Sequence, residues 1–196
     1  MRETAIVFAR APQLGAVKRR LAHDIGDRAA LRFYQANLFR LLRSLHRDRR
    51  FRTVLATTPD RAAARWPVRI PIIPQGRGDI GQRMHRACAR FRSVAIIGSD
   101  IPDACADDMA LAFRASRHAG AAFGPSMDGG YWLVALGSRR PARPFASVRW
   151  SSEHALADTL RNFRRRPAML RTLQDVDTAA DLAAIRSRSN APAGAA

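Results

Sequence analysis

Short apolar runs alternate along the chain with longer segments in which apolar residues recur at every third or fourth position. Residues 4–8 form an almost continuous apolar run, as in strands that a parallel sheet buries on both faces. Residues 28–46 have the helical period instead, which is carried by Leu31, Tyr34, Leu38, Leu41, Leu42 and Leu45. This alternation predicts an α/β domain built in layers, in which helices cover the faces of a sheet.

The same pattern, together with the turn residues between its segments, predicts the remaining elements. Strands are expected at residues 52–57, 69–73, 94–97, 121–124, 131–135 and 168–173, and helices from 61 to about 65, from the glycine-rich loop 75–81 to about 91, and at 103–118, 151–165 and 178–186. Pro71 indicates an edge position for its strand, and Thr178 with Asp181 forms a capping-box-like helix start. We expect one domain over residues 1–186, followed by a flexible tail at 187–196.

The composition limits the classes of protein that fit. Of the 196 residues, 47% are hydrophobic, which is enough for a sizeable core and argues against wholesale disorder. No apolar run approaches the roughly 18 residues that cross a bilayer, and the first residues lack the features of a signal peptide. We therefore expect a soluble, cytoplasmic protein with no membrane span. Cys88 and Cys105 form no CxxC pair, and both are expected to pack as small hydrophobic side chains.

The charge is strongly basic, with 34 Lys and Arg against 16 Asp and Glu and a formal net charge of +18. All but one of the 34 are arginines, and they are spread over the whole chain rather than interleaved with aromatic residues on one element. That distribution favours a solvated basic surface over a nucleic-acid-binding element. The basic charge should still favour small polyanionic ligands, and phosphate esters are the obvious candidates.

The loop after the first strand contains Gly15 and the only lysine of the chain, Lys18. Ligands of open α/β sheets bind beyond the carboxyl ends of strands, where backbone N–H groups and cations can hold phosphate. The glycine spacing fits neither a P-loop nor a dinucleotide-binding fingerprint. We expect a phosphate-binding loop of another kind; the alternative is a surface loop that contains a lysine by chance.

Asp100 follows directly after the apolar strand 94–97 and the Gly-Ser pair that ends it. A carboxylate in this place is suited to Mg²⁺ or Mn²⁺, because hard cations take oxygen ligands and usually keep substrate phosphate in their shell. The structural alternative is a cap for the next helix, but Pro102 intervenes and makes Asp103 the better cap candidate. We therefore favour the metal role for Asp100.

Two further acidic segments have structural explanations as well. The Asp-Gly-Gly segment 128–130 lies between two predicted strands and would by itself be a hairpin turn. Asp175 and Asp177 precede the last helix, and there Asp177 or Thr178 could cap that helix or hold a ligand. The five histidines lie on or beside predicted helices, where surface or structural roles are favoured over a catalytic triad or a zinc site.

Six segments, taken in order, resemble the blocks of one family: FARAP with VKRRL, QGRGDIGQRM, GSDIP, GPSMDGGYWLVAL, WSS at 150–152, and DVDTAADL. Over about residues 4–186 the chain is similar to the DUF2064 family of GT-A-type, glycosyltransferase-like proteins, which includes members assigned to arsenosugar biosynthesis. That family is similar in turn to the nucleotide-diphospho-sugar transferase superfamily, with its MobA-like and 2-phospholactate guanylyltransferase-like nucleotidyltransferases. The resemblance implies a three-layer α/β/α GT-A fold, Rossmann-like with a mostly parallel sheet, that binds a nucleoside diphosphate sugar or nucleoside triphosphate with Mg²⁺ or Mn²⁺.

The same resemblance implies roles for individual residues. Asp100 and Asp175 would hold the metal, and Lys18 would hold phosphate. The wider nucleotide- and phosphate-binding set would be Ala9, Arg10, Gly15, Lys18, Arg20, Gln75, Asp79 and Arg83, and the acceptor side would be lined by Asp128, Gly129, Gly130 and Tyr131. The family has Lys-Thr-Arg-Leu where this chain has Arg19 in place of the threonine, so a hydroxyl that could contact phosphate or metal is absent here.

Three functions fit these residues. The first is a metal-dependent glycosyltransferase that uses a nucleoside diphosphate sugar and a small-molecule acceptor, with Lys18 and the metal offsetting charge on the departing diphosphate and Asp128 as the base. The second is a nucleotidyltransferase that releases pyrophosphate from a nucleoside triphosphate. The third is a non-catalytic protein that binds a nucleotide, or attaches to RNA through its arginines.

Overall fold

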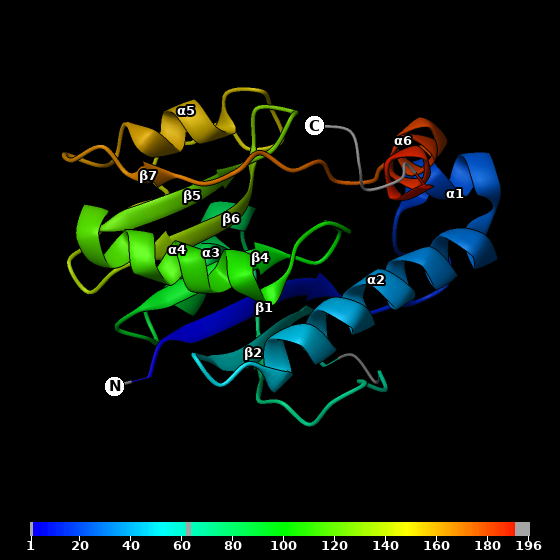
Figure 1. The fold of residues 1–196 in the computed structure, drawn as a ribbon, viewed down its shortest axis with the longest axis horizontal. Coiled ribbons are helices and arrows are strands. Elements are labelled where there is room, and N and C mark those ends of the chain that lie inside the picture. Colours follow the sequence, from blue (N-terminus) through cyan, green and yellow to red (C-terminus); the bar gives the residue numbers. More distant parts are fainter. Residues whose placement is uncertain (1, 62–63, 191–196) are drawn as a thin grey trace.

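Seven strands among the described residues form one sheet (Figure 1). A computed structural model describes residues 2–61 and 64–190. The strands are β1 (Thr4–Arg10), β2 (Arg52–Thr58), β3 (Ile72–Pro74), β4 (Val94–Gly98), β5 (Ala121–Pro125), β6 (Tyr131–Leu136) and β7 (Ala168–Met169). Their order is β3-β2-β1-β4-β6-β5-β7, and all neighbours are parallel except that β6 runs antiparallel to both β4 and β5. The expected mostly parallel sheet is thus confirmed, with β3 at an edge.

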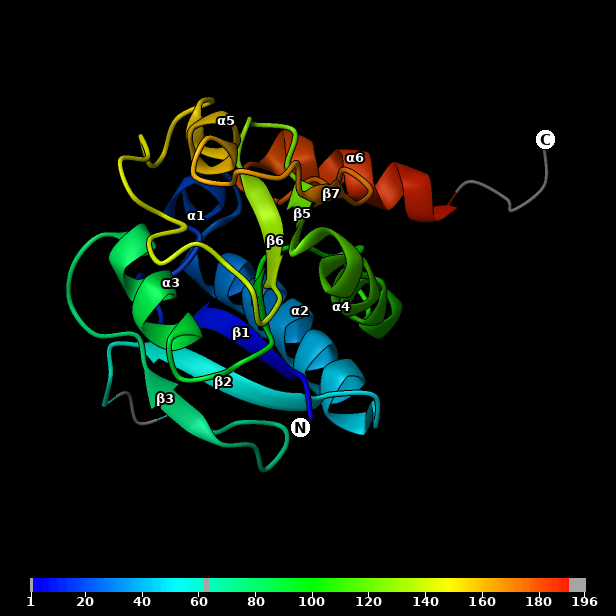
Figure 2. The same cartoon turned by 90° about the vertical axis from the view of Figure 1, so that its left-hand side faces the viewer.

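Helices cover both faces of this sheet. They are α1 (Arg19–Ile25), α2 (Asp27–Arg47), α3 (Ile80–Cys88), α4 (Ala106–Ala119), α5 (Ala155–Leu160) and α6 (Ala179–Asn190). Figure 2 shows the sheet between α2 and α4 on one side and α3 and α5 on the other. Side chains alternate along β1, so that Val7 packs with the leucines of α2 and with Phe113 of α4, and Ile6 packs with Met84 of α3. The three-layer α/β/α fold expected from the sequence is therefore present.

The long amphipathic helix and the strands β1, β2, β4, β5 and β6 lie where the apolar pattern places them, but other elements differ. The strand expected at 69–73 is Ile72–Pro74, and the one expected at 168–173 is only Ala168–Met169. Helix α1 was not expected, because its seven residues include two arginines, a histidine and an aspartate and show little apolar period. The helices expected at 103–118 and 151–165 begin later, at Ala106 and Ala155, and the second is much shorter. Helix α6 extends to Asn190 into the segment expected as a tail, whereas residues 191–196 lie outside the described residues. The helix expected from 61 to about 65 includes residues 62 and 63, which also lie outside them; residues 64–66 are not helical.

Asp103 does not cap α4, contrary to the expectation from the sequence. The N-cap is Cys105, whose backbone N–H donates to the Asp108 carboxylate at 2.9 Å. The Cys105 thiol donates to the same carboxylate at 3.3 Å, so this cysteine does more than pack as a hydrophobic side chain. Cys88 is buried in the apolar cluster as expected.

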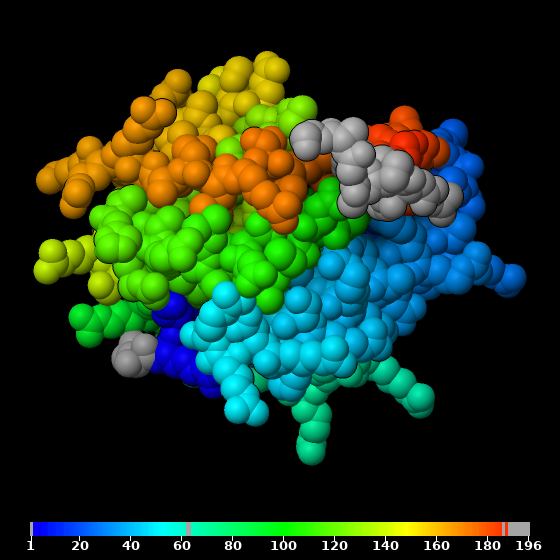
Figure 3. Space-filling model, in the orientation of Figure 1, coloured from blue at the N-terminus to red at the C-terminus, as the bar shows by residue number. Residues whose placement is uncertain are grey.

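The segment between β7 and α6 crosses the surface of the molecule beside α4 (Figure 3). It is held there by Arg171, whose guanidinium donates to both oxygens of Asp108 at 2.7 Å, and whose carbonyl accepts from the Trp132 indole at 3.2 Å. Further on, Val176 is fully buried among Leu21 and the apolar side of α6. These contacts fix the path of the acidic residues on either side of Val176. None of the helices among the described residues combines the length and the apolar character that a membrane span requires.

Candidate functional site

The site is built where the parallel strands β1 and β4 end. Phe8 of β1 lies beside Gly98 of β4, so the chain leaves both strands at the same edge of the sheet. The loop after β1 leads to Lys18, and the loop after β4 begins with Ser99 and Asp100. Carboxyl ends of neighbouring parallel strands are where open α/β sheets bind their ligands.

Helix α2 fixes the start of both loops through two polar side chains that face the sheet. The Tyr34 hydroxyl donates to the Arg10 carbonyl at 2.8 Å and lies 3.1 Å from the Ser99 hydroxyl. Asn37, one turn further along, donates to the Ser99 carbonyl at 3.2 Å. Sequence analysis assigned Tyr34 to the apolar stripe of the helix and overlooked Asn37; a buried asparagine in a leucine stripe is the signal that could have found this contact.

Lys18 lies at the centre of the site. Its ammonium donates to Asp100 Oδ2 at 2.9 Å and to Asp177 Oδ1 at 2.7 Å, and its side chain is only 5% exposed. Burial alone would lower the pKa of Lys18, but the two carboxylates outweigh it and raise the pKa above its ordinary value. The group therefore stays cationic. An ammonium has three N–H donors, so one remains for a further acceptor such as a phosphate oxygen.

Lys18 is also the N-cap residue of α1 and has a left-handed backbone, with φ 48° and ψ 50°. This conformation costs a non-glycine residue roughly 1 kcal/mol. The next turn is anchored by Leu21, which is fully buried against α6 and Val176. The tertiary packing of α1 thus holds the lysine in place, and it directs the side chain inward to the carboxylates.

Three carboxylates, from Asp100, Asp175 and Asp177, gather around this ammonium. One oxygen of each lies within 4.8 Å of the others. Asp177 does not cap α6: Thr178 takes that place in the expected capping box, accepting from Asp181 N at 3.2 Å and donating to its carboxylate at 2.8 Å. Sequence analysis assigned the metal role to Asp100 and Asp175 and left Asp177 open, and the structure brings all three together.

The negative charge of this cluster is only partly balanced. Burial, and after it the charges of Asp100 and Asp177, raise the pKa of Asp175 to about 6 against the lowering effect of Lys18. Three carboxylates facing one ammonium leave room for a second cation. Oxygen donors at this mutual distance fit Mg²⁺ or Mn²⁺, which prefer hard oxygen ligands and complete their shell with water or phosphate.

A cleft of about 320 Å³ opens beside Lys18, which is within the range of small-molecule sites. Arg10, Arg19 and Arg20 line it together with Lys18 and Asp100. The Arg20 side chain is 81% exposed, and its guanidinium lies 3.9 Å from Asp177 Oδ2, so it is free to turn toward a ligand. Ala9 is buried in β1, and Gly15 lies exposed in the loop that borders the cleft, with φ +70°.

The predicted binding residues of the glycine-rich loop after β3 form hydrogen bonds within the protein. Gln75 is buried, and its amide donates to the carbonyls of Ala9 and Ala56 at 3.2 and 2.9 Å. Asp79 is the N-cap of α3 and accepts from Gln82 N at 2.8 Å, and Arg83 donates to the Gly78 carbonyl at 2.8 Å. Gln75 thus ties the loop to β1 and β2, and Asp79 and Arg83 stabilise the start of α3. The contact of these residues with a nucleotide stays a prediction.

The Asp-Gly-Gly segment forms the turn between β5 and β6. Asp128 is exposed, and its carboxylate accepts from Gly130 N at 3.0 Å. Gly129 has φ +81°, and a Cβ there would lie 2.2 Å from the Glu153 carbonyl, so only glycine fits. Tyr131 does not face the cleft: its ring packs edge-on against Phe123 at 5.2 Å, in the apolar cluster beneath α5.

Solved structures with this fold define the class to which it belongs. A protein from Desulfovibrio desulfuricans G20, described as a candidate nucleotide-diphospho-sugar transferase, is 28% identical over 97% of this chain and 90% of its own, with a TM-score of 0.87. The fold is also that of 4-diphosphocytidyl-2C-methyl-D-erythritol synthase from Anaerococcus prevotii DSM 20548, at 10% identity, 96% coverage of each chain and a TM-score of 0.59. The Rv0371c protein of Mycobacterium tuberculosis H37Rv, in complex with manganese, shares it at 14% identity, 94% and 98% coverage and a TM-score of 0.54.

The protein therefore has the nucleotide-diphospho-sugar transferase fold. Its residues 41–152 match the DUF2064 family, described as an uncharacterised protein conserved in bacteria, and this match spans more than half of the chain. The chain belongs to the DUF2064 family, as the ordered sequence blocks predicted. No curated protein sequence matches it.

Proposed function

We propose that the protein is a metal-dependent glycosyltransferase that takes a nucleoside diphosphate sugar as its donor and a small molecule as its acceptor. The observation that carries this proposal is the Lys18 ammonium held among Asp100, Asp175 and Asp177 at the carboxyl ends of β1 and β4. Such an arrangement combines a fixed cation with oxygen ligands for a divalent cation beside a cleft of small-molecule size. The fold shared with the Desulfovibrio protein supports it.

Each group would have a defined part in the reaction. Asp100, Asp175 and Asp177 would hold Mg²⁺ or Mn²⁺, which when bound stabilises negative charge on phosphate oxygens. The third N–H of Lys18 would donate to the diphosphate, and Arg10 and Arg20 would reach it from the rim of the cleft. The base and sugar would extend along the loop that begins at Gln75, past Asp79 and Arg83.

Asp128 is the proposed base of a transfer that inverts configuration at the sugar. Its carboxylate would take the proton of the acceptor hydroxyl as that oxygen bonds to the anomeric carbon, and the bond from this carbon to the diphosphate breaks with its electron pair on the leaving nucleoside diphosphate. Asp128 is exposed, so an acceptor can approach its carboxylate from the solvent. The charge of the Asp128 carboxylate contributes to the raised pKa of Asp175, which indicates that the turn lies near the carboxylate cluster.

Replacing Asp128 with asparagine should lower turnover at least about a hundredfold with little change in donor binding, because general base catalysis contributes on this scale. Asparagine keeps the oxygen that accepts from Gly130 N, so the turn should persist. Steady-state kinetics gives turnover, and thermal unfolding with donor gives binding. The control is Glu153→Gln, an exposed carboxylate beside the same turn. Unchanged turnover in Asp128→Asn would remove Asp128 from this role.

The competing reaction is nucleotidyl transfer, which the same cations could support and which the fold shared with the Anaerococcus synthase brings into consideration. The two reactions differ in their products. Glycosyl transfer releases a nucleoside diphosphate, whereas nucleotidyl transfer from a triphosphate releases pyrophosphate.

The function is tested by screening nucleoside diphosphate sugars and nucleoside triphosphates with Mg²⁺ or Mn²⁺, first by thermal unfolding and then by product analysis. A bound ligand at a hundred times its dissociation constant should raise stability by about 2.7 kcal/mol. We expect stabilisation by one diphospho-sugar and release of its nucleoside diphosphate. Pyrophosphate release would establish the nucleotidyl reaction instead, and no binding of any nucleotide would overturn both.

A further inference from the structure

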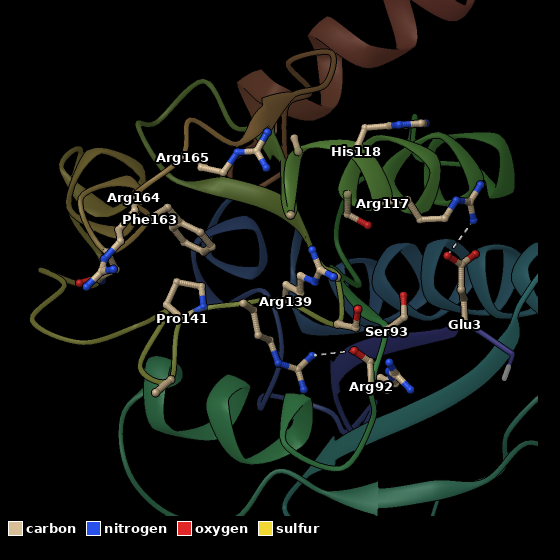
Figure 4. A pocket seen from close by; sticks show the side chains of 18 of the residues that line it. Glu3, Arg92, Ser93, Arg117, His118, Arg139, Pro141, Phe163, Arg164 and Arg165 are labelled. Carbon is tan, nitrogen blue, oxygen red and sulfur yellow. Dashed lines mark hydrogen bonds and ion pairs between the residues drawn. The ribbon is translucent and has the colours of Figure 1, made fainter.

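A second and larger cavity lies at the opposite end of the strands, beside the amino ends of β1 and β4. Its volume is about 1210 Å³. It is lined by Glu3 and Ser93, the residues directly before β1 and β4, and by the segments that follow β6 and α5 (Figure 4). β1 has seven residues, so the two ends of the sheet are roughly 20 Å apart. The cavity is therefore separate from the Lys18 site.

Arginines are concentrated around this cavity. Seven of its nineteen lining residues are arginine, more than a third, whereas 33 of the 196 residues of the chain are arginine, about a sixth. Glu3 is the only acidic residue among the nineteen, and its carboxylate is already paired with Arg117 at 2.8 Å. The lining is thus about twice as rich in arginine as the chain as a whole, and its one carboxylate leaves most of this charge unbalanced.

The lining arginines fall into two groups. The first group, Arg2, Arg117 and Arg140, is held by contacts within the fold. Arg2 donates to the Arg49 carbonyl at 2.6 Å, Arg117 pairs with Glu3, and Arg140 donates to the carbonyls of Cys88 and Phe91 at 2.9 and 2.6 Å. In contrast, Arg92, Arg139, Arg164 and Arg165 have no side-chain hydrogen bond or ion pair with any residue in 2–61 or 64–190. In Figure 4 the guanidinium groups of Arg139 and Arg165 extend into the cavity from two different loops.

We propose that this arginine-lined cavity binds a small soluble anion that carries two or more phosphate groups. Guanidinium groups bind phosphate oxygens in pairs, and groups that come from separate loops would contact separate phosphates of one ligand. The cavity can admit such a molecule because its volume is at or above that of ordinary small-molecule sites. This site does not depend on the function proposed for the Lys18 site.

Two larger classes of ligand fit the cavity less well. Single-stranded nucleic acids stack their bases on aromatic side chains, but the lining has no Tyr or Trp, and its one Phe, Phe163, packs edge-on against Phe123 at 5.5 Å beside the core. A membrane surface would need apolar side chains on the rim, and none of the exposed large hydrophobic residues of the described chain lines the cavity. A small polyphosphate needs neither feature.

The test is calorimetric titration with inorganic tripolyphosphate in the presence of EDTA, which leaves the carboxylate cluster without metal. The double variant Arg139→Ala/Arg165→Ala should bind at least about tenfold more weakly than the wild-type protein, because each lost guanidinium contact with a charged group is worth about that factor. Both side chains are exposed and have no partner in the described structure, so the fold should not change. Thermal unfolding checks this.

Two control variants locate the binding. Arg28→Ala/Arg32→Ala removes the same charge from an exposed part of α2 outside both cavities and should change the affinity less than twofold. Lys18→Met removes the cation of the other site and should leave tripolyphosphate binding in place. An equal loss in the two arginine variants would show attraction by the general basic surface only, and a complete loss in Lys18→Met would assign all binding to the Lys18 site. Either result overturns the proposal.

The size class of the ligand is tested in the same way. A ten-nucleotide uridine RNA and vesicles of phosphatidylcholine with phosphatidylserine should bind no more tightly than tripolyphosphate. They should bind equally to the cavity variant Arg139→Ala/Arg165→Ala and to the control Arg28→Ala/Arg32→Ala. Tighter binding of RNA or vesicles that is lost only in Arg139→Ala/Arg165→Ala would replace the small ligand by that partner.

Discussion

Replacing Asp100 with alanine should abolish the metal-dependent stabilisation of the protein by its nucleotide ligand and lower turnover at least about a hundredfold. Asp100 contributes one of three carboxylates whose oxygens lie within 4.8 Å of one another. Even groups that only support metal ligands change affinity by about 10- to 100-fold when they are lost, so the loss of a proposed ligand should reach at least the upper figure. Without the divalent cation, the charge that develops on the diphosphate loses its main counter-charge.

The measurement is Mn²⁺ titration by calorimetry, followed by thermal unfolding with and without the nucleotide ligand. The alanine variant should still fold, since Lys18 keeps its 2.7 Å contact with Asp177. Asp107→Ala is the matched control: it removes the same charge from an exposed position on α4, where the contact with Arg50 lies at the surface. Mn²⁺ affinity that is equal in wild-type protein and Asp100→Ala would exclude Asp100 as a metal ligand.

The fold could be predicted from the sequence to the extent that it depends on long apolar periods. The strands 4–8 and 94–97 are buried on both faces and read as continuous apolar runs, and α2 has a leucine on almost every turn of its inner face. Helix α1 has no such period, because only Leu21 is buried and the tertiary packing against α6 stabilises it. Helix α4 begins at Ala106 because the Asp108 carboxylate accepts from the backbone of Cys105. Residue preferences alone favour Asp103 over Cys105 as the cap, so this start could not be predicted.

The candidate site could be predicted only in part for a related reason. The motif blocks and the strand ends indicated Lys18, Asp100 and Asp175, which the structure brings together at one edge. The direction of a side chain on a loop depends on what the rest of the chain places beside it. Asp177 could have been a helix cap in the sequence, and it points to Lys18 because Thr178 and Asp181 form the cap instead. The ring of Tyr131 packs into the core for the same kind of reason.

In the proposed site, Lys18 and a divalent cation would compete for the same carboxylates, which gives the second large expected effect. Replacing Lys18 with methionine should lower the melting temperature of the metal-free protein by about 2–12 °C. The ammonium of a lysine that is 5% exposed would no longer offset the carboxylates of Asp100 and Asp177, a loss of about 1–3 kcal/mol. Methionine keeps the length and apolar stem of the side chain, so packing should change little.

Lys18→Met should nevertheless bind Mn²⁺ at least about tenfold more tightly than the wild-type protein, because a divalent cation within the carboxylate cluster no longer faces a neighbouring positive charge. Added Mn²⁺ should therefore raise the melting temperature more in this variant than in the wild type. Turnover should still fall about a hundredfold, since the diphosphate loses the third N–H of the ammonium. The two variants should therefore differ. Lys18→Met should bind Mn²⁺ more tightly and turn over more slowly, whereas Asp100→Ala should lose both Mn²⁺ affinity and turnover. Weaker Mn²⁺ binding in Lys18→Met would instead show that the lysine positions the carboxylates for the metal and does not compete with it.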